Sequence, residues 1–338
     1  MLGMFDKRLR ERIIPNYRKT PQEVYQEFFM AYMDIYNSLD LLQLCSFATK
    51  KLENLPSWVP DLTSTVIKPL QASFAHANTK AYASLVAPGV LAANGIDAGR
   101  VHAVNDVQLR SHIFRTPRET LQLLKSWHAF ALEHMTEYPG YPFAESFFTT
   151  VIFGWVADRR TWGESAEAQE ADFQRMLAIP ADDPTLDEQI AGSILLQTFS
   201  RDPRDMELFA TEDGKLALGP LGTKPGDIVS ILLGSSFAII LRPATLGSRN
   251  DVFHVIGQAF VFGLIDGEGV LGSFPEPWRG YFDIDPDNGG HIAQFKNKET
   301  GVVGEEDPRL EGVEDVEAFL GLDALKWRGV DVRTFHLV

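Results

Sequence analysis

The sequence predicts an α+β protein in which a helical domain packs with a small antiparallel β-barrel or curled sheet. Three observations indicate this class. Short apolar runs separated by Asp-Gly, Pro-Gly-Asp and Gly-Ser turns fill residues 207–271, capped amphipathic helices precede them, and the composition is that of a globular chain. With 338 residues, of which 45% are hydrophobic and 23% charged, the chain is long enough for two domains.

The strand signal is strongest in residues 207–272, which we interpret as a small β-barrel-like module. Apolar runs flank Asp213-Gly214, a pair that supplies the positive φ values of a tight hairpin turn. Two more apolar runs flank Gly234-Ser235-Ser236 in the same way. Several short antiparallel strands this close in sequence tend to close on themselves, because open sheet edges invite unwanted pairing.

Residues 1–206 are predicted to form a mainly helical domain. Its clearest helices begin at Thr20-Pro21-Gln22-Glu23 and at Thr116-Pro117-Arg118-Glu119, two capping boxes with proline at the first helical position. Residues 55–61, Leu-Pro-Ser-Trp-Val-Pro-Asp, form a rigid connector because two prolines fix the backbone. Residues 90–104 contain a possible pair of strands around Asn94-Gly95, which we expect to pair with the β module.

The last part of the chain, residues 273–338, is predicted to be a loop-rich segment that closes on the β module. Its final residues alternate apolar and polar side chains through Val332, Phe335 and Leu337. Such alternation favours a C-terminal strand, which would attach the end of the chain to the sheet.

Charge and cysteine content limit the function classes. A net charge of −15 argues against a nucleic-acid partner, which needs clustered lysine and arginine. A single cysteine, Cys45, excludes an intramolecular disulfide and every multi-cysteine metal site. No apolar run reaches the length of a membrane span, and the N-terminus lacks the apolar core of a signal peptide. We therefore expect a cytoplasmic protein with no membrane partner, no metal and no cofactor.

No recognisable catalytic constellation is present, so whether the chain is an enzyme stays open at this point. There is neither a glycine-rich phosphate loop nor a Gly-x-Ser-x-Gly elbow. Asp266 and Glu268 are the nearest approach to a catalytic pair. Two acids one residue apart on a turn can face a cleft together, where burial and mutual repulsion raise one pKa. The alternative is a structural turn with both acids in solvent.

Two candidate ligand-binding residues lie in the connector. Trp58 stands between its two prolines and is either a packing plug or a platform for a ligand. Asp61 is the last residue of the connector and is its polar candidate.

Three more candidates lie in the β module. Arg242 precedes a proline at a strand end and either binds substrate or locks a carboxylate such as Asp266 in a bidentate pair. Phe260 and Phe262 follow each other on one face of a predicted strand. They either line an apolar ligand pocket or fill the core.

With these segments in view, the sequence resembles the fungal heterokaryon incompatibility (HET) domain proteins. The resemblance touches both ends of the chain and rests on the order in which short segments follow one another. These segments are Ile13-Ile14-Pro15-Asn16-Tyr17 with Val24-Tyr25, the connector 55–61, Leu208-Phe209, Asp213-Gly214, Leu218-Gly219-Pro220, Gly226-Asp227-Ile228-Val229, Leu232-Leu233-Gly234, Leu241-Arg242-Pro243, the run from Gly257 to Glu268, Glu306-Asp307-Pro308-Arg309-Leu310 and Phe335-His336-Leu337-Val338.

The resemblance implies a role and a class of partner. In the family these segments follow an N-terminal α/β effector domain, and this chain begins where that domain would end. The expectation is a HET-like protein without the effector domain, acting as a regulatory or interaction protein in self/non-self recognition through a protein partner. Ser230 replaces the family's usual cysteine, and phenylalanines at 260 and 262 replace its usual tyrosine and histidine.

A second hypothesis belongs to a different class. The chain is then a stand-alone enzyme or binding protein for an apolar small molecule, recruited in secondary metabolism. Its motivation is the abundance of aromatic residues, 23 phenylalanines and 6 tryptophans, which would line a pocket between the helices and the β module.

Overall fold

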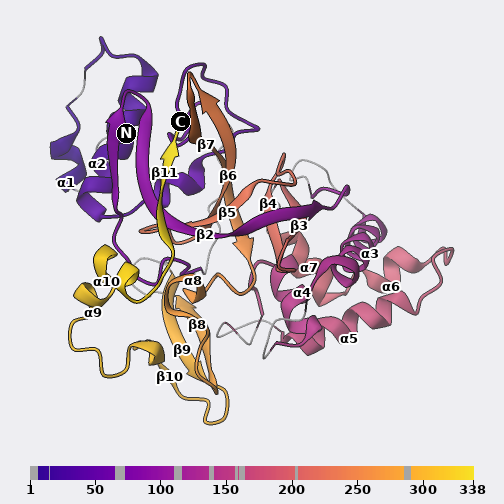
Figure 1. Ribbon diagram of the computed structural model, residues 1–338. Helices are drawn as coiled ribbons and strands as arrows, with labels where there is room; N and C mark the ends of the chain where they lie inside the picture. The colour runs from indigo at the N-terminus through magenta and orange to yellow at the C-terminus, as the bar shows by residue number, and fades with distance from the viewer. Residues whose placement is uncertain are drawn as a thin grey trace.

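The computed structural model describes residues 7–14, 16–64, 73–109, 116–136, 141–156, 159, 164–201, 205–284 and 291–338 (Figure 1). The fold is mixed α+β with a curled, mainly antiparallel sheet, as the sequence predicts. None of the helices in these residues is long and apolar enough to cross a membrane.

The helical elements within the described residues are α1 (Lys7–Arg12), α2 (Pro21–Tyr36), η2 (Asp40–Leu44), α3 (Pro117–His134), α4 (Phe143–Val151), α5 (Ala166–Leu177), α6 (Leu186–Ile190), α7 (Ile194–Arg201), α8 (Glu268–Leu271), η3 (Pro308–Leu310), α9 (Val316–Phe319) and α10 (Leu322–Trp327). Helices α2 and α3 begin at the predicted capping boxes. In each, the threonine side chain accepts from the backbone of the glutamate three residues on, and that glutamate accepts in return.

The strands are β1 (Ala83–Ala87), β2 (Val90–Val104), β3 (Met206–Thr211), β4 (Leu216–Pro220), β5 (Ile228–Leu232), β6 (Ala238–Leu246), β7 (Arg249–Val261), β8 (Trp278–Ile284), β9 (His291–Asn297), β10 (Val303–Gly304) and β11 (Val332–Leu337). The hairpins predicted around Asp213-Gly214 and Gly234-Ser235-Ser236 are β3–β4 and β5–β6. Gly214 and Gly234 have φ of 79° and 82°, the positive values for which the turns need glycine.

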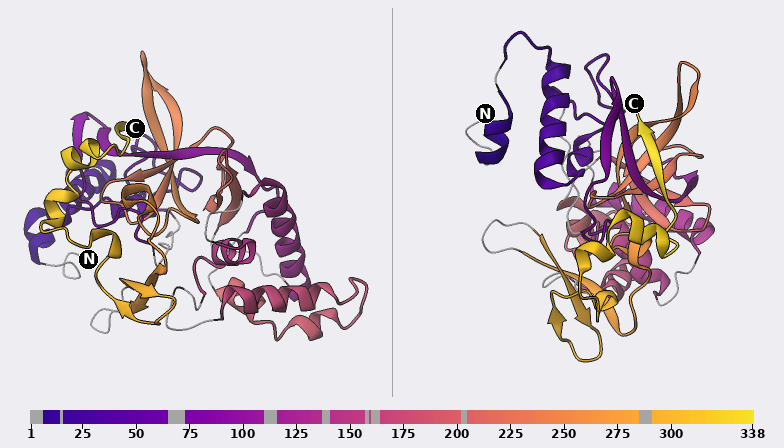
Figure 2. Two further views of the ribbon diagram at one scale, coloured as in Figure 1. Left: turned by 60° about the horizontal axis from the view of Figure 1, so that its bottom comes forward. Right: turned by 60° about the vertical axis from the view of Figure 1, so that its left-hand side comes forward.

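Six strands close into a ring in the order β2, β3, β4, β7, β6, β5 and back to β2, with antiparallel neighbours throughout. β1 pairs with the first half of β2, and β11 lies between β2 and β7. The chain therefore forms a small barrel whose long strand, β2, reaches across the molecule toward α3 (Figure 2, left).

The pair of strands expected in residues 90–104 is one continuous strand, so the turn predicted at Asn94-Gly95 does not form. Gly95 lies between β11 and β5, opposite Arg333 and Leu232. A Cβ atom at this position would lie 2.6 Å from the carbonyl oxygen of Ile231. The glycine thus serves close approach of two strands rather than a turn, a second use of glycine that a single sequence does not distinguish.

The barrel strands are buried on both faces because separate cores lie on either side. In β5, Val229 and Ile231 belong to one apolar cluster, whereas Ile228 and Leu232 belong to another. The second cluster is covered by α2 and the connector, with Trp58 at 0% exposure. A strand buried on both faces is apolar throughout, which explains the continuous apolar runs of the β module.

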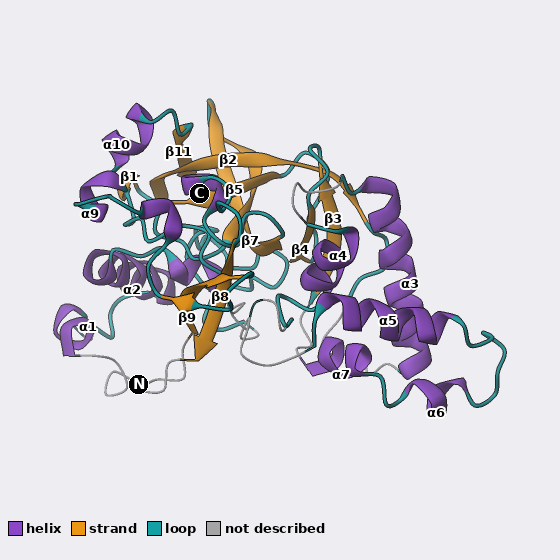
Figure 3. Cartoon of the chain, turned by 90° about the horizontal axis from the view of Figure 1, so that it is seen from below, coloured by secondary structure: helices purple, strands orange, loops and turns teal. Residues whose placement is uncertain are grey.

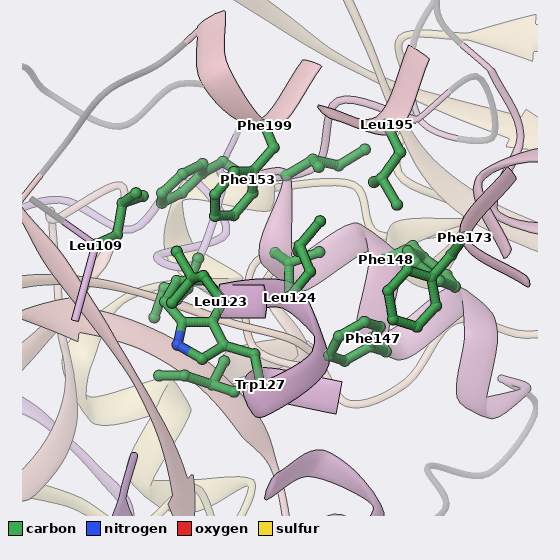
Figure 4. Close-up of a cluster of buried hydrophobic side chains, with 14 of the residues drawn as sticks. Leu109, Leu123, Leu124, Trp127, Phe147, Phe148, Phe153, Phe173, Leu195 and Phe199 are labelled. Carbon is green, nitrogen blue, oxygen red and sulfur yellow. The ribbon is translucent and has the colours of Figure 1, made fainter. Parts of the chain in front are cut away.

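A helical layer covers the other end of the barrel. Helices α3 to α7 gather beyond β3 and β4, on the side opposite α1 and α2 (Figure 3). Their large side chains form one buried cluster in which Trp127, Phe147 and Phe173 are almost fully enclosed (Figure 4). This cluster includes Leu208 of β3 and Phe260 of β7, so the helices and the barrel share a single core.

The C-terminal segment is more regular than the loop-rich segment that the sequence indicates. β8, β9 and β10 form a separate antiparallel sheet beside the barrel, and α9 and α10 lead into β11 (Figure 1). These strands are not predicted from the sequence; in β9 the polar residues of His291–Asn297 weaken the strand signal, and β10 has only two residues.

Candidate functional site

The side chains of Trp58 and Asp61, the two candidates in the connector, contact other parts of the protein in place of an open site. Trp58 donates its indole N–H to the carbonyl oxygen of Gly89 at 3.0 Å and packs edge-on against Phe29, with ring centroids 5.0 Å apart. This is the packing role, one of the two alternatives considered for this side chain.

Asp61 organises the backbone around the connector. Its carboxylate accepts hydrogen bonds from the backbone N–H groups of Lys51, Leu52 and Thr63 at 2.7, 2.8 and 2.9 Å. Burial works to raise the pKa of Asp61, but these bonds and one from the Thr63 hydroxyl lower it to about 2. Because these hydrogen bonds occupy the Asp61 carboxylate, its role in this structure is to hold the backbone of the neighbouring residues in place.

Arg242 does not pair with Asp266, so the partner predicted for it is wrong. Its guanidinium forms a bidentate pair with Asp227, with distances of 2.8 and 2.7 Å, and donates to the carbonyl oxygen of Gly222. The cause is the register of the hairpin, because Ile228 of β5 lies opposite Leu241 of β6 and places the two charged neighbours side by side.

Phe260 and Phe262 both lie in the packed junction between barrel and helices. Phe260 is fully buried and meets Phe153 edge-on at 6.3 Å. Phe262 is 5% exposed and meets Tyr141 edge-on at 5.1 Å. The cavity that borders Phe262 has a volume of about 10 Å³, room for about one water. Beside Phe262, side chains therefore fill the space in which an apolar pocket was expected.

The carboxyl pair Asp266 and Glu268 does lie in an unusual setting. Both follow β7: Asp266 lies in the turn that leads into α8 and is only 4% exposed, and Glu268 is the first residue of α8. The Asp266 carboxylate forms a bidentate ion pair with Arg159, which follows α4 and is 7% exposed. The pair joins residues 107 positions apart, and it connects the helical layer to the end of the barrel.

Glu268 accepts a hydrogen bond from the backbone N–H of Asp266 at 2.7 Å. Burial, followed by the charge of Asp266, raises the pKa of Glu268 to about 7. A raised pKa for one acid belongs to only one of the two alternatives that the sequence leaves open, a pair facing a cleft rather than a turn in solvent. A carboxyl that exchanges its proton near neutrality is the chemically distinctive group of this region.

A second buried ion pair completes the cluster. Arg309, in η3, forms a bidentate pair with Asp307 and also donates to the backbone carbonyl oxygens of Asp266 and Gly272. The side chains of Arg309 and Asp307 are 4% and 5% exposed. We call Arg159, Asp266, Glu268, Asp307 and Arg309 the ion cluster. Its two guanidinium groups face three carboxyl groups, so it is neutral only when one carboxyl, Glu268, holds a proton.

Neither arginine of the ion cluster was identified from the sequence. Arg309 lies in a segment that carries the family resemblance, which was the one available signal. Arg159 gave none, because its partner is far away in the sequence and its own neighbourhood has no regular pattern.

Gly280 of β8 permits the close approach of Asp266. A Cβ atom at position 280 would lie 2.5 Å from Cγ of that aspartate. We expect Gly280→Ala to lower the free energy of unfolding by about 1–3 kcal/mol through overpacking. Urea denaturation measures the change, with Gly304→Ala in β10 as the control because its Cβ would meet no atom within 4 Å. Equal effects of the two substitutions would contradict the crowding argument.

The ion cluster can hold three segments of the chain together and exchange one proton, but the cavity that Arg159, Asp266 and Glu268 border has a volume of only about 10 Å³ and leaves no room there for a substrate. Within the part of the chain that is described, no three histidine, cysteine, aspartate or glutamate side chains group as a metal site requires. A catalytic role for Asp266 and Glu268 stays a prediction.

Comparison with known proteins agrees with the architecture. Residues 144–273 match the family model of the Het-6 beta-barrel domain, a stretch that takes in α4 to α7, β3 to β7 and α8. Comparison with the curated proteins and with the solved structures gave no match. The matched residues contain Arg159, Asp266 and Glu268, so most of the ion cluster lies inside the family domain. Residues 144–273 of this chain thus form a Het-6 beta-barrel domain, which is associated with fungal heterokaryon incompatibility.

Proposed function

We propose that this chain is a regulatory or interaction protein of fungal self/non-self recognition that acts inside the cell through contacts with another protein. The single observation that carries the proposal is the Het-6 beta-barrel match over residues 144–273. The packing of the region supports a binding role over a catalytic one, because the candidate carboxyls contact protein groups in place of an open cleft.

The proposal is tested by genetic confrontation of fungal strains. The chain is expressed in a strain that lacks it, and that strain is fused with partners of the same and of different incompatibility type. We expect fewer viable heterokaryons in the unlike pairing only, with dye uptake by the fused cells as a direct measure of cell death. The control strain expresses an unrelated protein of similar size at the same level. Equal heterokaryon survival in both pairings, with the chain present by immunoblot, would overturn the proposal.

A further inference from the structure

A large cavity lies under the C-terminal segment, where Asp307 of the ion cluster is one of its lining residues. Its volume is about 1330 Å³. Residues 73–78 form one wall, β8 and β9 form a second, and residues 304–316 form a third. Figure 1 shows this side of the molecule, where the β8–β9 hairpin and the segment leading to α9 extend below the barrel.

The first wall, residues 73–78, is fixed to the barrel by hydrogen bonds. The backbone N–H of Phe74 donates to the carbonyl oxygen of Ile265 at 2.6 Å, and that of Ala75 donates to Ser236 at 3.1 Å. The third wall is attached through Arg309, whose guanidinium binds the backbone of the turn at Asp266 and Gly272. The cavity is thus held open by anchored segments, which reduces the ordering cost of binding a ligand.

The inner surface of the cavity is aromatic. Phe282 and Phe295 are buried, whereas Phe74 and Trp278 are half-buried. The rings of Phe74 and Phe295 meet edge-on with centroids 6.3 Å apart. Aromatic faces of this kind attract cations as well as apolar groups.

The third wall of the cavity carries three glutamates. Glu305, Glu306 and Glu311 line it, are exposed, and make no ion pair with any described residue. Inside, the buried Nδ1 atom of His76 has no hydrogen-bond partner among the described groups. Burial lowers the pKa of His76 below its usual value, so this ring is neutral at pH 7 and offers a polar contact without repelling a cation.

We propose that this cavity binds a basic peptide segment of a protein partner, with an arginine or lysine beside an apolar residue. The carboxylates of the third wall complement the positive charge, and the half-buried rings of Phe74 and Trp278 accept the apolar side chain and the flat guanidinium. A volume of about 1330 Å³ exceeds the ~300–1,000 Å³ of ordinary small-molecule pockets and suits several consecutive residues. The identity of the partner rests on the proposed function, whereas the chemistry of the cavity does not.

The test uses the full chain and three mixtures of fluorescein-labelled hexapeptides. All have phenylalanine, leucine, valine or isoleucine at the outer positions, and the two central residues are arginine, glutamine or glutamate. Fluorescence polarisation in low salt measures binding. We expect the arginine mixture to bind, the glutamate mixture to bind at least about tenfold more weakly, and added salt to weaken the arginine mixture.

Two variants locate the site. The triple variant Glu305→Gln, Glu306→Gln, Glu311→Gln is expected to bind the arginine mixture about tenfold more weakly. Its matched control replaces the exposed Glu164, Glu188 and Glu212 by glutamine, which changes the net charge equally and is expected to leave binding within about twofold. Trp278→Ala should also weaken binding, and circular dichroism verifies that each variant is folded.

The outcomes separate this inference from the proposed function. No binding of the arginine mixture, or equal losses in the triple variant and its control, would overturn the cavity as a basic-peptide site. If spermidine displaces the arginine mixture at the same concentration as the peptides, the site binds small polycations. That result would overturn the proposal that its ligand is a peptide. The strain confrontation does not depend on any peptide, so a negative result here together with a positive one there rejects the cavity alone.

Discussion

Replacing Arg159 by leucine is expected to lower the free energy of unfolding by about 3–5 kcal/mol, because the substitution leaves the buried carboxylate of Asp266 without its ion partner. Asp266 is 4% exposed, so bulk solvent does little to replace the two lost hydrogen bonds. The change also removes the guanidinium that lies 5.3 Å from the ring centre of Phe282. Equilibrium urea denaturation followed by circular dichroism measures the loss.

A matched control separates burial from ion pairing as such. Arg249 forms the same bidentate pair with Asp251, but the two side chains are 39% and 59% exposed. Arg249→Leu should cost much less than Arg159→Leu, since solvent screens exposed pairs. If the two substitutions have the same small effect, the pair between Arg159 and Asp266 is not buried in solution.

The double variant Arg159→Leu, Asp266→Leu shows where the cost arises. Removing both charges removes the desolvation penalty along with the attraction, so most of the stability should return. Hydrogen exchange should show the single variant loosening α4 and α5 before the barrel strands, because the pair connects those helices to the turn after β7. Losses that simply add would indicate that the two side chains do not interact.

The helix starts and hairpins were predictable because their signals are local. The capping boxes at Thr20 and Thr116 and the Asp213-Gly214 turn each rest on a few consecutive residues, and the structure confirms all three. The Asn94-Gly95 turn was wrong for a physical reason. Glycine inside β2 allows two backbones to approach closely, and that requirement comes from strands distant in the sequence.

In the ion cluster, too, nearby residues in the sequence predict some features, whereas others depend on packing between distant segments. Only the smaller cause of the raised pKa of Glu268, the charge of Asp266 two residues away, followed from a local fact, because burial is the larger cause. The identity of the arginine that meets Asp266 did not, because Arg159 reaches it only through the packing of the helical layer on the barrel. Arg242 was the plausible partner by sequence distance, and strand register paired it with Asp227 instead.

Replacing Glu268 by glutamine is expected to stabilise the protein at pH 8, by up to about 3 kcal/mol. The pKa of Glu268 rises from its usual value of 4.5 to about 7 in the folded chain, and each unit corresponds to about 1.4 kcal/mol. Between these values the folded chain holds a proton that the unfolded chain has released, so stability falls as pH rises from about 4.5 to 7. Glutamine keeps an oxygen for the N–H of Asp266 and carries no charge.

The quantity to measure is therefore the difference in free energy of unfolding between Glu268→Gln and the unmodified chain at each pH. Denaturation in urea from pH 4.5 to 8 should give equal stabilities at the acid end and a gap that opens across this window. His76, whose lowered pKa destabilises the fold as pH falls below its usual value of 6.5, is present in both proteins and cancels. Glu212→Gln, at an exposed position, should shift stability by less than about 0.5 kcal/mol at every pH. If the free energy of unfolding changes with pH in the same way for Glu268→Gln and the unmodified chain, the Glu268 carboxyl titrates as an exposed one does. Solvent and its ions would then balance the charge of the ion cluster.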